Sequence, residues 1–143
     1  MVKFAANLSM LFTEVAFLDR FQKAGDFGFK ATEYLFPYAY EPDLLAGKLK
    51  QHKLKQELFN LPPGNWEKGE KGLAALPERR AEFEQSLETA LVYAKALDCR
   101  KLHVMAGVLE PQKDFKIYED TFIKNFRIAA DFFEPYGIML LIE

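Results

Sequence analysis

Short apolar runs alternate with longer amphipathic stretches along the chain, which is typical of βα units and not of a helical bundle or a β-sandwich. Each short run lies next to Pro, Gly or Asn residues of the kind that bound strands. The pattern predicts five strands, at residues 3–8, 31–36, 55–60, 101–106 and 137–142. Because helical stretches separate them, the strands should form a parallel sheet.

The amphipathic stretches predict four helices, at residues 13–24, 42–52, 78–97 and 114 or 115 to 133. Thr13 can cap the first helix, and Pro42 fits the first turn of the second. Pro77 fits the first turn of the third helix, whose apolar side chains recur every three or four positions. Pro135 ends the fourth. The chain is therefore expected to form a single α/β domain over residues 1–143.

Two parallel architectures satisfy this order: an open doubly wound sheet, or an arc of a TIM-type (β/α) barrel. An open sheet that binds a dinucleotide commonly carries G-x-G-x-x-G after its first strand, but here that strand runs into NLSMLFTE. The phosphate-binding pattern G-x-x-x-x-G-K-[ST] is also absent from the sequence. Nucleotide binding is therefore disfavoured, and the pattern leaves both architectures open.

Composition and charge narrow the range of partners. Half of the 143 residues are hydrophobic, so the chain can bury a core. Its 19 basic and 21 acidic residues give a net charge of -2, which disfavours a nucleic-acid binder that neutralises phosphates. No apolar run approaches the roughly 20 residues that cross a bilayer, so no membrane helix is expected.

The cysteine content bears on the cellular compartment in which the protein is expected. Cys99 is the single cysteine, which excludes an internal disulfide framework and a multi-cysteine zinc site. Without a spaced partner, it is expected to be structural. The N-terminus imitates a signal peptide only weakly, because Asn7 and Ser9 interrupt its apolar stretch. A reducing compartment, the cytoplasm, is the expected location.

Polar residues at the carboxyl ends of the predicted strands are the first candidates for chemistry, because both architectures bind ligands there. They are Asn7, Glu33, Asn60, His103 and Glu143. Either asparagine could instead bond its own backbone in a turn. Glu33 lies among apolar residues, which favours an inward carboxylate with a partner over a solvated one.

His103 and Glu143 differ in how sharply they indicate function. Strand alternation puts His103 on one face with Lys101 and Met105, and either face of the strand could be the inner one. A lone histidine is more often a hydrogen-bonded structural residue than a ligand. Glu143 follows the run GIMLLI, where a carboxylate is placed as an acid, a base or a metal ligand; a frayed end is the alternative.

The segment 60–77 is long for a loop in a compact domain, and such loops are usually lids or binding loops. Trp66 could close over a small ligand, or it could anchor the loop to the body of the protein. Arg79 and Arg80 could meet an anionic substrate, although two basic residues that open a helix are more often solvated.

Five stretches, in order along the chain, carry a family resemblance: FAANLSMLFTE, EYLFPY, FNLPPGNWEKGEKGLAALPERR, ALVYAKALDCRKLHVMAG and LLIE. They resemble the hydroxypyruvate isomerase family of xylose isomerase-like (β/α) barrels. The family commonly has Asp where this chain has Asn65, and Pro-Gly-Arg where it has Pro77-Glu78-Arg79. A complete barrel of this type needs roughly 250 residues and eight strands. The resemblance therefore implies an α/β fold that is an incomplete TIM-type barrel of about five strands and four helices.

The resemblance implies an isomerase that interconverts hydroxypyruvate and 2-hydroxy-3-oxopropanoate (tartronate semialdehyde) through an enediolate. One carboxylate removes a proton beside the carbonyl and a second returns it to the neighbouring carbon. A divalent cation such as Mg²⁺ or Mn²⁺, or hydrogen-bond donors, stabilise the oxyanion. Glu143 corresponds to one of the two acid/base glutamates and to a metal ligand. Asn7, Asn60 and His103 would line the substrate pocket.

Two alternatives stay open at this point. The chain could be a catalytically silent half-barrel that acts as an interaction protein, and its open edges, above all GIMLLI, favour homodimerisation or aggregation. A related sugar isomerase or epimerase is the other alternative, because the same barrel and carboxylate chemistry serve several substrates. The expected partner of the enzyme is a small hydroxy-carbonyl acid, and neither a nucleic acid nor a membrane.

Overall fold

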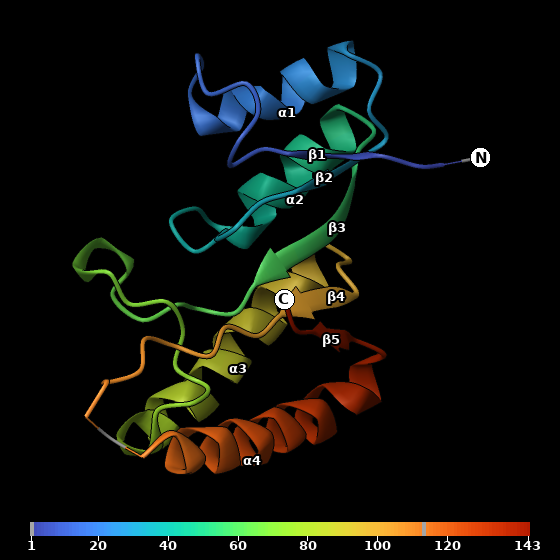
Figure 1. Cartoon of the computed structure of the whole chain (residues 1–143). Helices are drawn as coiled ribbons and strands as arrows, with labels where there is room; N and C mark the ends of the chain where they lie inside the picture. The colour runs from blue at the N-terminus through green and yellow to red at the C-terminus, as the bar shows by residue number, and fades with distance from the viewer. Residues whose placement is uncertain (1, 113) are drawn as a thin grey trace. The chain divides into compact units, whose positions relative to one another are not determined.

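The computed structural model describes residues 2–112 and 114–143, which hold a five-stranded sheet and four α-helices in alternation (Figure 1). The strands are β1 (Ala5–Asn7), β2 (Ala31–Glu33), β3 (Lys55–Asn60), β4 (Lys101–His103) and β5 (Met139–Leu141). The helices are α1 (Phe17–Asp26), α2 (Pro42–Gln51), α3 (Arg80–Ala96) and α4 (Phe115–Phe133). The strand order is β1-β2-β3-β4-β5, and β2 pairs in parallel with both β1 and β3. The predicted parallel α/β fold is confirmed, and every strand lies within its predicted range.

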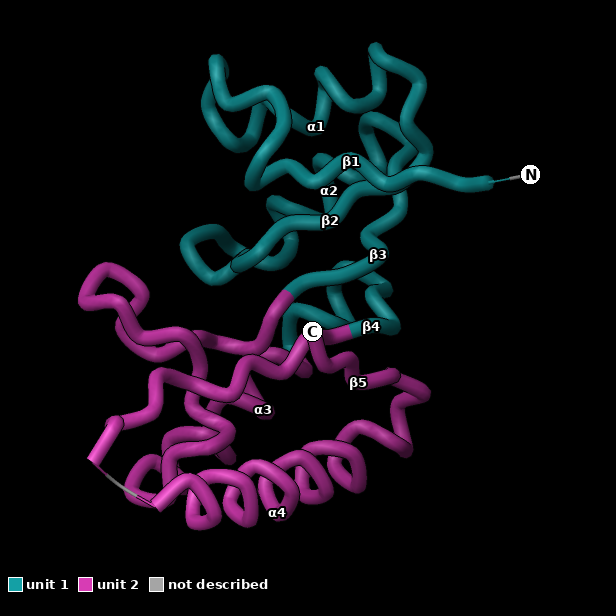
Figure 2. The backbone as a smooth tube through the Cα atoms, viewed as in Figure 1, with its two compact units in different colours: residues 1–59, 92–101 teal, residues 60–91, 102–143 magenta. Residues whose placement is uncertain are grey.

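Backbone contacts divide the chain into two compact units (Figure 2). Unit 1 comprises residues 1–59 and 92–101, and unit 2 comprises residues 60–91 and 102–143. The boundaries therefore fall within β3, α3 and β4. The single domain expected over the whole chain stays a prediction.

Unit 1 has an aromatic core between α1 and the strands. The rings of Phe17 and Phe21 both meet the ring of Tyr34 edge-on, with centroids 5.3 and 5.9 Å away, a favourable arrangement for aromatic pairs. β2 and β3 also bury a polar pair, in which Oγ1 of Thr32 donates to Oε1 of Gln56 at 3.2 Å. Because both side chains are shielded from water, this hydrogen bond offsets their desolvation.

Unit 2 buries one face of β4 and of the segment that follows it. Leu102 and Val104 are buried, whereas His103 between them is partly exposed. The alternation predicted from the sequence is thus resolved: the face with Leu102 and Val104 is buried, and the face with His103 is the more exposed one. Asn125 of α4 is also buried, and its Nδ2 donates to the carbonyl oxygen of Ala74 at 2.9 Å. This hydrogen bond ties α4 to the long loop after β3.

The first helix begins at Phe17, so the start predicted at Thr13 is wrong. Phe12 has a left-handed backbone with φ of 60°, and the Val15 amide donates to the Phe12 carbonyl at 3.2 Å. Residues 12–15 therefore form a turn, and Thr13 lies inside it. The residue that caps α1 is Ala16, which makes no side-chain capping hydrogen bond.

The other helix ends follow the predictions closely. Pro77 opens a short 3-10 turn, η2 (Pro77–Arg79), which leads directly into α3. Asp114 caps α4, because its Oδ1 accepts a hydrogen bond from the Lys116 amide at 2.9 Å. None of the helices in the described part of the chain is both long and apolar enough to span a membrane.

β2 and β4 end well before their predicted ends, and residues beyond each of them form hydrogen bonds with other partners. After β2, the Leu35 amide donates to the Ser9 hydroxyl at 2.9 Å instead of to a neighbouring strand. After β4, the carbonyl of Ala106 accepts from the Ala75 amide at 2.7 Å. The long loop thus pairs with the extension of β4, a contact that strand periodicity does not predict.

Candidate active site

The ends of three strands bring Asn60, His103 and Glu143 together in unit 2. Asn60 and His103 are the last residues of β3 and β4, and Glu143 follows β5. Nδ1 of His103 lies 3.3 Å from Oδ1 of Asn60 and 4.0 Å from Oε2 of Glu143. We call these three residues the strand-end cluster, and they are three of the four residues that the sequence predicts for a pocket.

The members of the strand-end cluster differ in exposure. Asn60 is 6% exposed, whereas the side chains of His103 and Glu143 are 12% and 66% exposed. A buried amide needs partners for both its oxygen and its nitrogen. Asn60 has them, because its Nδ2 donates to Sδ of Met105 at 3.6 Å. The cluster therefore combines an amide held at both ends with a carboxylate that reaches solvent.

The fourth predicted residue, Asn7, belongs to a pair in unit 1. Its Nδ2 donates to Oε1 of Glu33 at 3.0 Å, and its Oδ1 accepts from the Ser9 amide at 3.0 Å. The turn interpretation of Asn7 is therefore confirmed, and its second contact joins β1 to β2. Its place in a substrate pocket stays a prediction. Glu33 is a carboxylate with a partner, as its apolar surroundings predicted.

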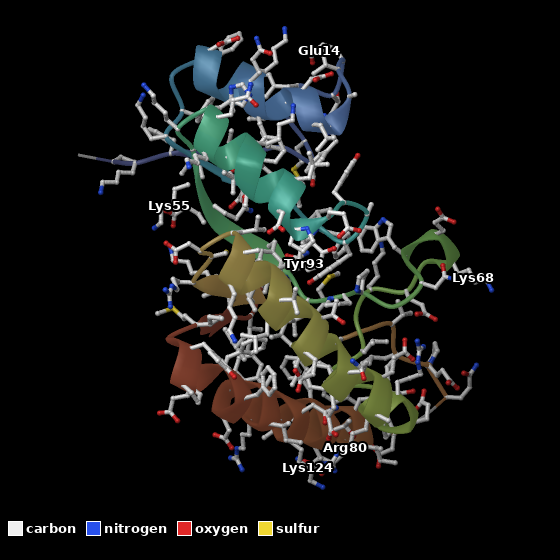
Figure 3. The ribbon with its side chains drawn as sticks, turned by 180° about the vertical axis from the view of Figure 1, so that it is seen from behind. Glu14, Lys55, Lys68, Arg80, Tyr93 and Lys124 are labelled. Atoms are coloured by element: carbon white, nitrogen blue, oxygen red, sulfur yellow. The ribbon has the colours of Figure 1, made fainter. Side chains whose placement is uncertain are left out.

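The long loop of unit 2 carries a compact tip, residues 64–71. At its base the Gly72 amide donates to the Pro63 carbonyl at 2.9 Å. Within the tip, Oδ1 of Asn65 accepts from the Lys68 amide at 3.1 Å and caps a 3-10 turn. Figure 3 shows Lys68 on this tip. The tip is thus closed by its own hydrogen bonds.

Trp66 lies in the tip and is 38% exposed. The Lys71 ammonium lies 3.7 Å from the centroid of its ring, which is cation–π geometry. This contact is internal to the loop. The closure of Trp66 over a small ligand stays a prediction.

Arg79 holds the tip to the start of α3. Its guanidinium donates to both carboxylate oxygens of Glu70, at 3.1 and 3.2 Å, and to both of Glu82, at 2.6 and 2.7 Å. These hydrogen bonds lower the pKa of both carboxyl groups. The expectation that Arg79 is solvated is therefore wrong, because it is the central member of a carboxylate–guanidinium–carboxylate group. The neighbouring Arg80 is exposed, pairs with exposed Glu84 and matches that expectation.

The sequence analysis did not identify the Arg79 group, which consists of Arg79, Glu70 and Glu82, although half of it follows from helical spacing. Glu82 lies one helical turn after Arg79, and such a pair is visible in the sequence. Glu70 lies nine positions before it, in a loop whose path the sequence does not determine. The same holds for Met105, whose contact with Asn60 joins residues 45 positions apart.

Cys99 is buried, and its Sγ donates to the Lys101 carbonyl at 3.3 Å. Burial raises the pKa of this thiol to about 11. A thiol of this kind is a poor nucleophile at neutral pH. The expectation that Cys99 is structural is therefore supported.

The cation expected from the family resemblance can be tested against the side chains present. Among the described residues, no group of three or more His, Cys, Asp or Glu side chains is placed to hold a metal ion. Oε2 of Glu143 lies 4.0 Å from Nδ1 of His103. The described residues alone therefore do not fit a metal ion held by three protein ligands.

The strand-end cluster can nevertheless carry out proton chemistry. An exposed carboxylate can accept a proton from a carbon beside a carbonyl group, provided that hydrogen-bonding groups lie near the oxygen that becomes negative. Glu143 offers the carboxylate, and His103 offers a ring nitrogen beside it. This arrangement fits isomerisation better than nucleophilic catalysis, because the described cluster has no activated hydroxyl or thiol.

Comparison with known proteins identifies the family of the chain. The family model described as xylose isomerase-like TIM barrel matches residues 21–143. Over all 143 residues the chain is 54% identical to the 2-oxo-tetronate isomerase of Pectobacterium atrosepticum and 41% identical to the hydroxypyruvate isomerase of Escherichia coli. It spans 55% of the length of each. The chain therefore covers about half of the curated relatives that it matches.

Solved structures give the same picture. A Brucella melitensis structure titled AP endonuclease, family 2, aligns with 99% of the chain and 55% of its own length, at 53% identity and a TM-score of 0.97. The 3-keto-D-glucoside 4-epimerase of Escherichia coli aligns with 99% of the chain and 56% of its own length. Its TM-score is 0.72 at 11% identity, so it shows the fold alone. These matches favour the barrel arc over the open doubly wound sheet.

Proposed function

The chain belongs to the xylose isomerase-like TIM barrel family, and from this premise we propose that it is part of an isomerase acting on a short hydroxy-oxo acid. The observation that carries the proposal is the strand-end cluster, in which the Glu143 carboxylate lies beside His103, which also contacts Asn60. A carboxylate at the carboxyl end of a barrel strand is placed where barrels of this type bind substrates.

The relatives suggest the substrate class. Their names specify 2-oxo-tetronate, a four-carbon acid, and hydroxypyruvate, a three-carbon acid. Both acids have a carbonyl group at C2 and a hydroxyl group at C3, so the same proton transfers serve both. The relatives of higher identity carry the four-carbon name, and we propose 2-oxo-tetronate as the first substrate and hydroxypyruvate as the second.

Glu143 acts as the base in the proposed reaction. Its carboxylate takes the proton from C3, and the electrons of that C–H bond form a double bond between C3 and C2. The electrons of the C2 carbonyl move to its oxygen, which gives an enediolate. A proton is then delivered to C2, the C3 oxygen becomes the carbonyl oxygen, and its proton passes to the oxygen on C2. Atoms and electrons balance without an oxidant or a reductant.

The second proton transfer and the cation remain proposals for a longer protein. The resemblance implies a second glutamate, which we assign to the part of the relatives that this chain does not span. A divalent cation, if bound there, would stabilise the negative oxygen as a Lewis acid. Glu143 would supply one of its carboxylate ligands.

Deuterium exchange tests the first proton transfer. The purified chain is incubated with hydroxypyruvate in D₂O, and loss of the C3 proton signal is followed by NMR. The step needs only one base, so the chain should accelerate exchange over the rate without protein. Glu143→Gln should lower the acceleration by at least about 100-fold, because general base catalysis contributes on that order.

Glu88→Gln is the matched control, because Glu88 is exposed on α3 in the same unit. It should exchange the C3 proton like the unchanged chain. Equal rates for all three proteins and for buffer would refute the proposed role of Glu143. Repeating the assay with 2-oxo-tetronate ranks the two substrates, and a faster rate with hydroxypyruvate would reverse the order proposed above.

A further inference from the structure

We infer that Asn60 is a positioning residue, which holds His103 in the tautomer with the proton on Nδ1 so that Nε2 accepts a hydrogen bond from a substrate hydroxyl group. The identity of the substrate rests on the proposed function. The tautomer itself depends only on the side chains of unit 2 and can be tested without turnover.

The surroundings of Nδ1 determine where the proton lies. A neutral imidazole carries its proton on one nitrogen and a lone pair on the other. Nδ1 faces two oxygen atoms, Oδ1 of Asn60 at 3.3 Å and Oε2 of Glu143 at 4.0 Å. Neither an amide oxygen nor a carboxylate oxygen can donate. A lone pair on Nδ1 would be repelled by both oxygen atoms. The proton therefore belongs on Nδ1, where it points to Asn60.

The contact of the Asn60 NH₂ group determines which way round the amide lies. Its NH₂ group faces the Met105 thioether, with Nδ2 3.6 Å from Sδ. A thioether sulfur accepts hydrogen bonds and has no proton to donate. Turning the amide over would place its oxygen against the sulfur and its NH₂ group against His103. Because Asn60 is 6% exposed, bulk water could not compensate for that loss.

The proton on Nδ1 leaves a lone pair on Nε2. The His103 side chain is 12% exposed, so part of it is open to solvent and to a small ligand. A lone pair repels a carbonyl or carboxylate oxygen, whereas it accepts a hydroxyl proton. His103 should therefore prefer 2-oxo acids that carry a hydroxyl group, such as hydroxypyruvate, over pyruvate, which has none.

Imidazole ¹⁵N NMR of the full chain tests the tautomer. Spectra are recorded at pH 8.5. The chain has two histidines, and His52 provides an internal reference. The His103 signal should show the Nδ1–H form in the unchanged chain and in Asn60→Asp, whose carboxylate also accepts from Nδ1. Asn60→Ala should shift the equilibrium towards the Nε2–H form, while an unchanged His52 signal shows that the variant is folded.

Ligand binding measured in the same samples tests the hydroxyl preference. Hydroxypyruvate should bind roughly three- to tenfold more tightly than pyruvate, as one hydrogen bond provides. Asn60→Ala should reduce this ratio to about one, and Asn60→Asp should keep it.

Each outcome separates this inference from the proposed function. An Nε2–H form in the unchanged chain would overturn the inference even if the chain exchanges the C3 proton of hydroxypyruvate. The same holds if Asn60→Ala keeps the Nδ1–H form. An Nδ1–H form that is lost in Asn60→Ala, without any exchange activity, would uphold the tautomer and overturn the proposed function instead.

Discussion

Gly72 packs so closely against Met105 that a β-carbon on Gly72 would overlap the Met105 carbonyl oxygen. Its φ is 113°, in a region that L side chains rarely adopt. Gly72 also forms an isolated antiparallel bridge with Ala106. The absence of a side chain at this one position lets the long loop lie directly on the extension of β4, next to the methionine that holds Asn60.

Gly72→Ala should destabilise the chain. The added methyl group meets backbone, which cannot rotate away, and the conformation itself becomes strained. We expect the free energy of unfolding to fall by more than about 2 kcal/mol in urea titrations. Gly47→Ala is the control, because Gly47 lies in α2 with open space around its β-position. That change should raise stability by roughly 0.5–1 kcal/mol, and equal effects of the two substitutions would contradict the argument.

Two tyrosines of unit 1 should respond oppositely to loss of their hydroxyl groups. Among the described residues, the Tyr34 hydroxyl is the buried side-chain group that finds no hydrogen-bond partner. The Tyr93 hydroxyl, by contrast, donates to the Tyr40 carbonyl at 2.9 Å. Tyr34→Phe should raise the free energy of unfolding by about 1 kcal/mol, and Tyr93→Phe should lower it by a similar amount. A loss of stability in both variants would show that the Tyr34 hydroxyl has a partner, such as an ordered water.

The Arg79 group should make stability depend on pH in the acid range. Glu70 and Glu82 have pKa values below the ordinary 4.5, because Arg79 donates hydrogen bonds to their ionised forms. In the unfolded chain they take up protons first as the pH falls. The stabilisation is therefore complete above pH 4.5 and is lost as the pH falls through the lowered values.

Thermal unfolding of Arg79→Gln between pH 7 and pH 3 measures this effect. The midpoint of the variant should lie below that of the unchanged chain at pH 7, and the difference should close towards pH 3. Arg80→Gln is the control, because Arg80 and its partner Glu84 are both exposed and such pairs contribute little. A difference that stays constant over the whole range would rule out the ion pairs as its source.

Cys99 should react slowly with thiol reagents in the folded chain. Burial raises the pKa of its thiol to about 11, from an ordinary value of 9.0, so little thiolate is present at pH 8. The residue is also closed to solvent. We expect reaction with an aromatic disulfide to be at least about 100-fold slower in the native chain than in urea. Rapid native labelling would mean that this part of unit 1 opens readily.

Local pattern was sufficient to predict the strands and most helix ends. The apolar runs around Leu102 and Phe59 mark their strands, and Asp114 and Pro135 bound α4 as predicted. The prediction that Thr13 caps the first helix is wrong, because capping propensity is only a local preference. The left-handed backbone of Phe12 places Thr13 inside a turn. Side-chain patterns did not reveal that turn.

The sequence was sufficient to predict which strand-end residues form the candidate site. It was not sufficient to predict the side-chain contacts around them. Asn60, His103 and Glu143 could be named because parallel strands end at a common edge. The link from Asn60 to Met105 could not, because it depends on how tightly the loop lies on β4. Glu70 and Arg79 were missed for the same reason, since their contact requires the exact path of the loop.

The closed base of the loop tip makes it a natural position for protein engineering. The Gly72 amide and the Pro63 carbonyl already join the two ends of the tip. Peptide inserted between Lys68 and Gly69 would therefore leave the base joined and the Asn65 cap in place. Lys68 and Gly69 are exposed, and exposed loop tips are where insertions are best tolerated. An affinity tag or a fluorescent reporter could thus be carried at this tip, leaving both chain termini unmodified.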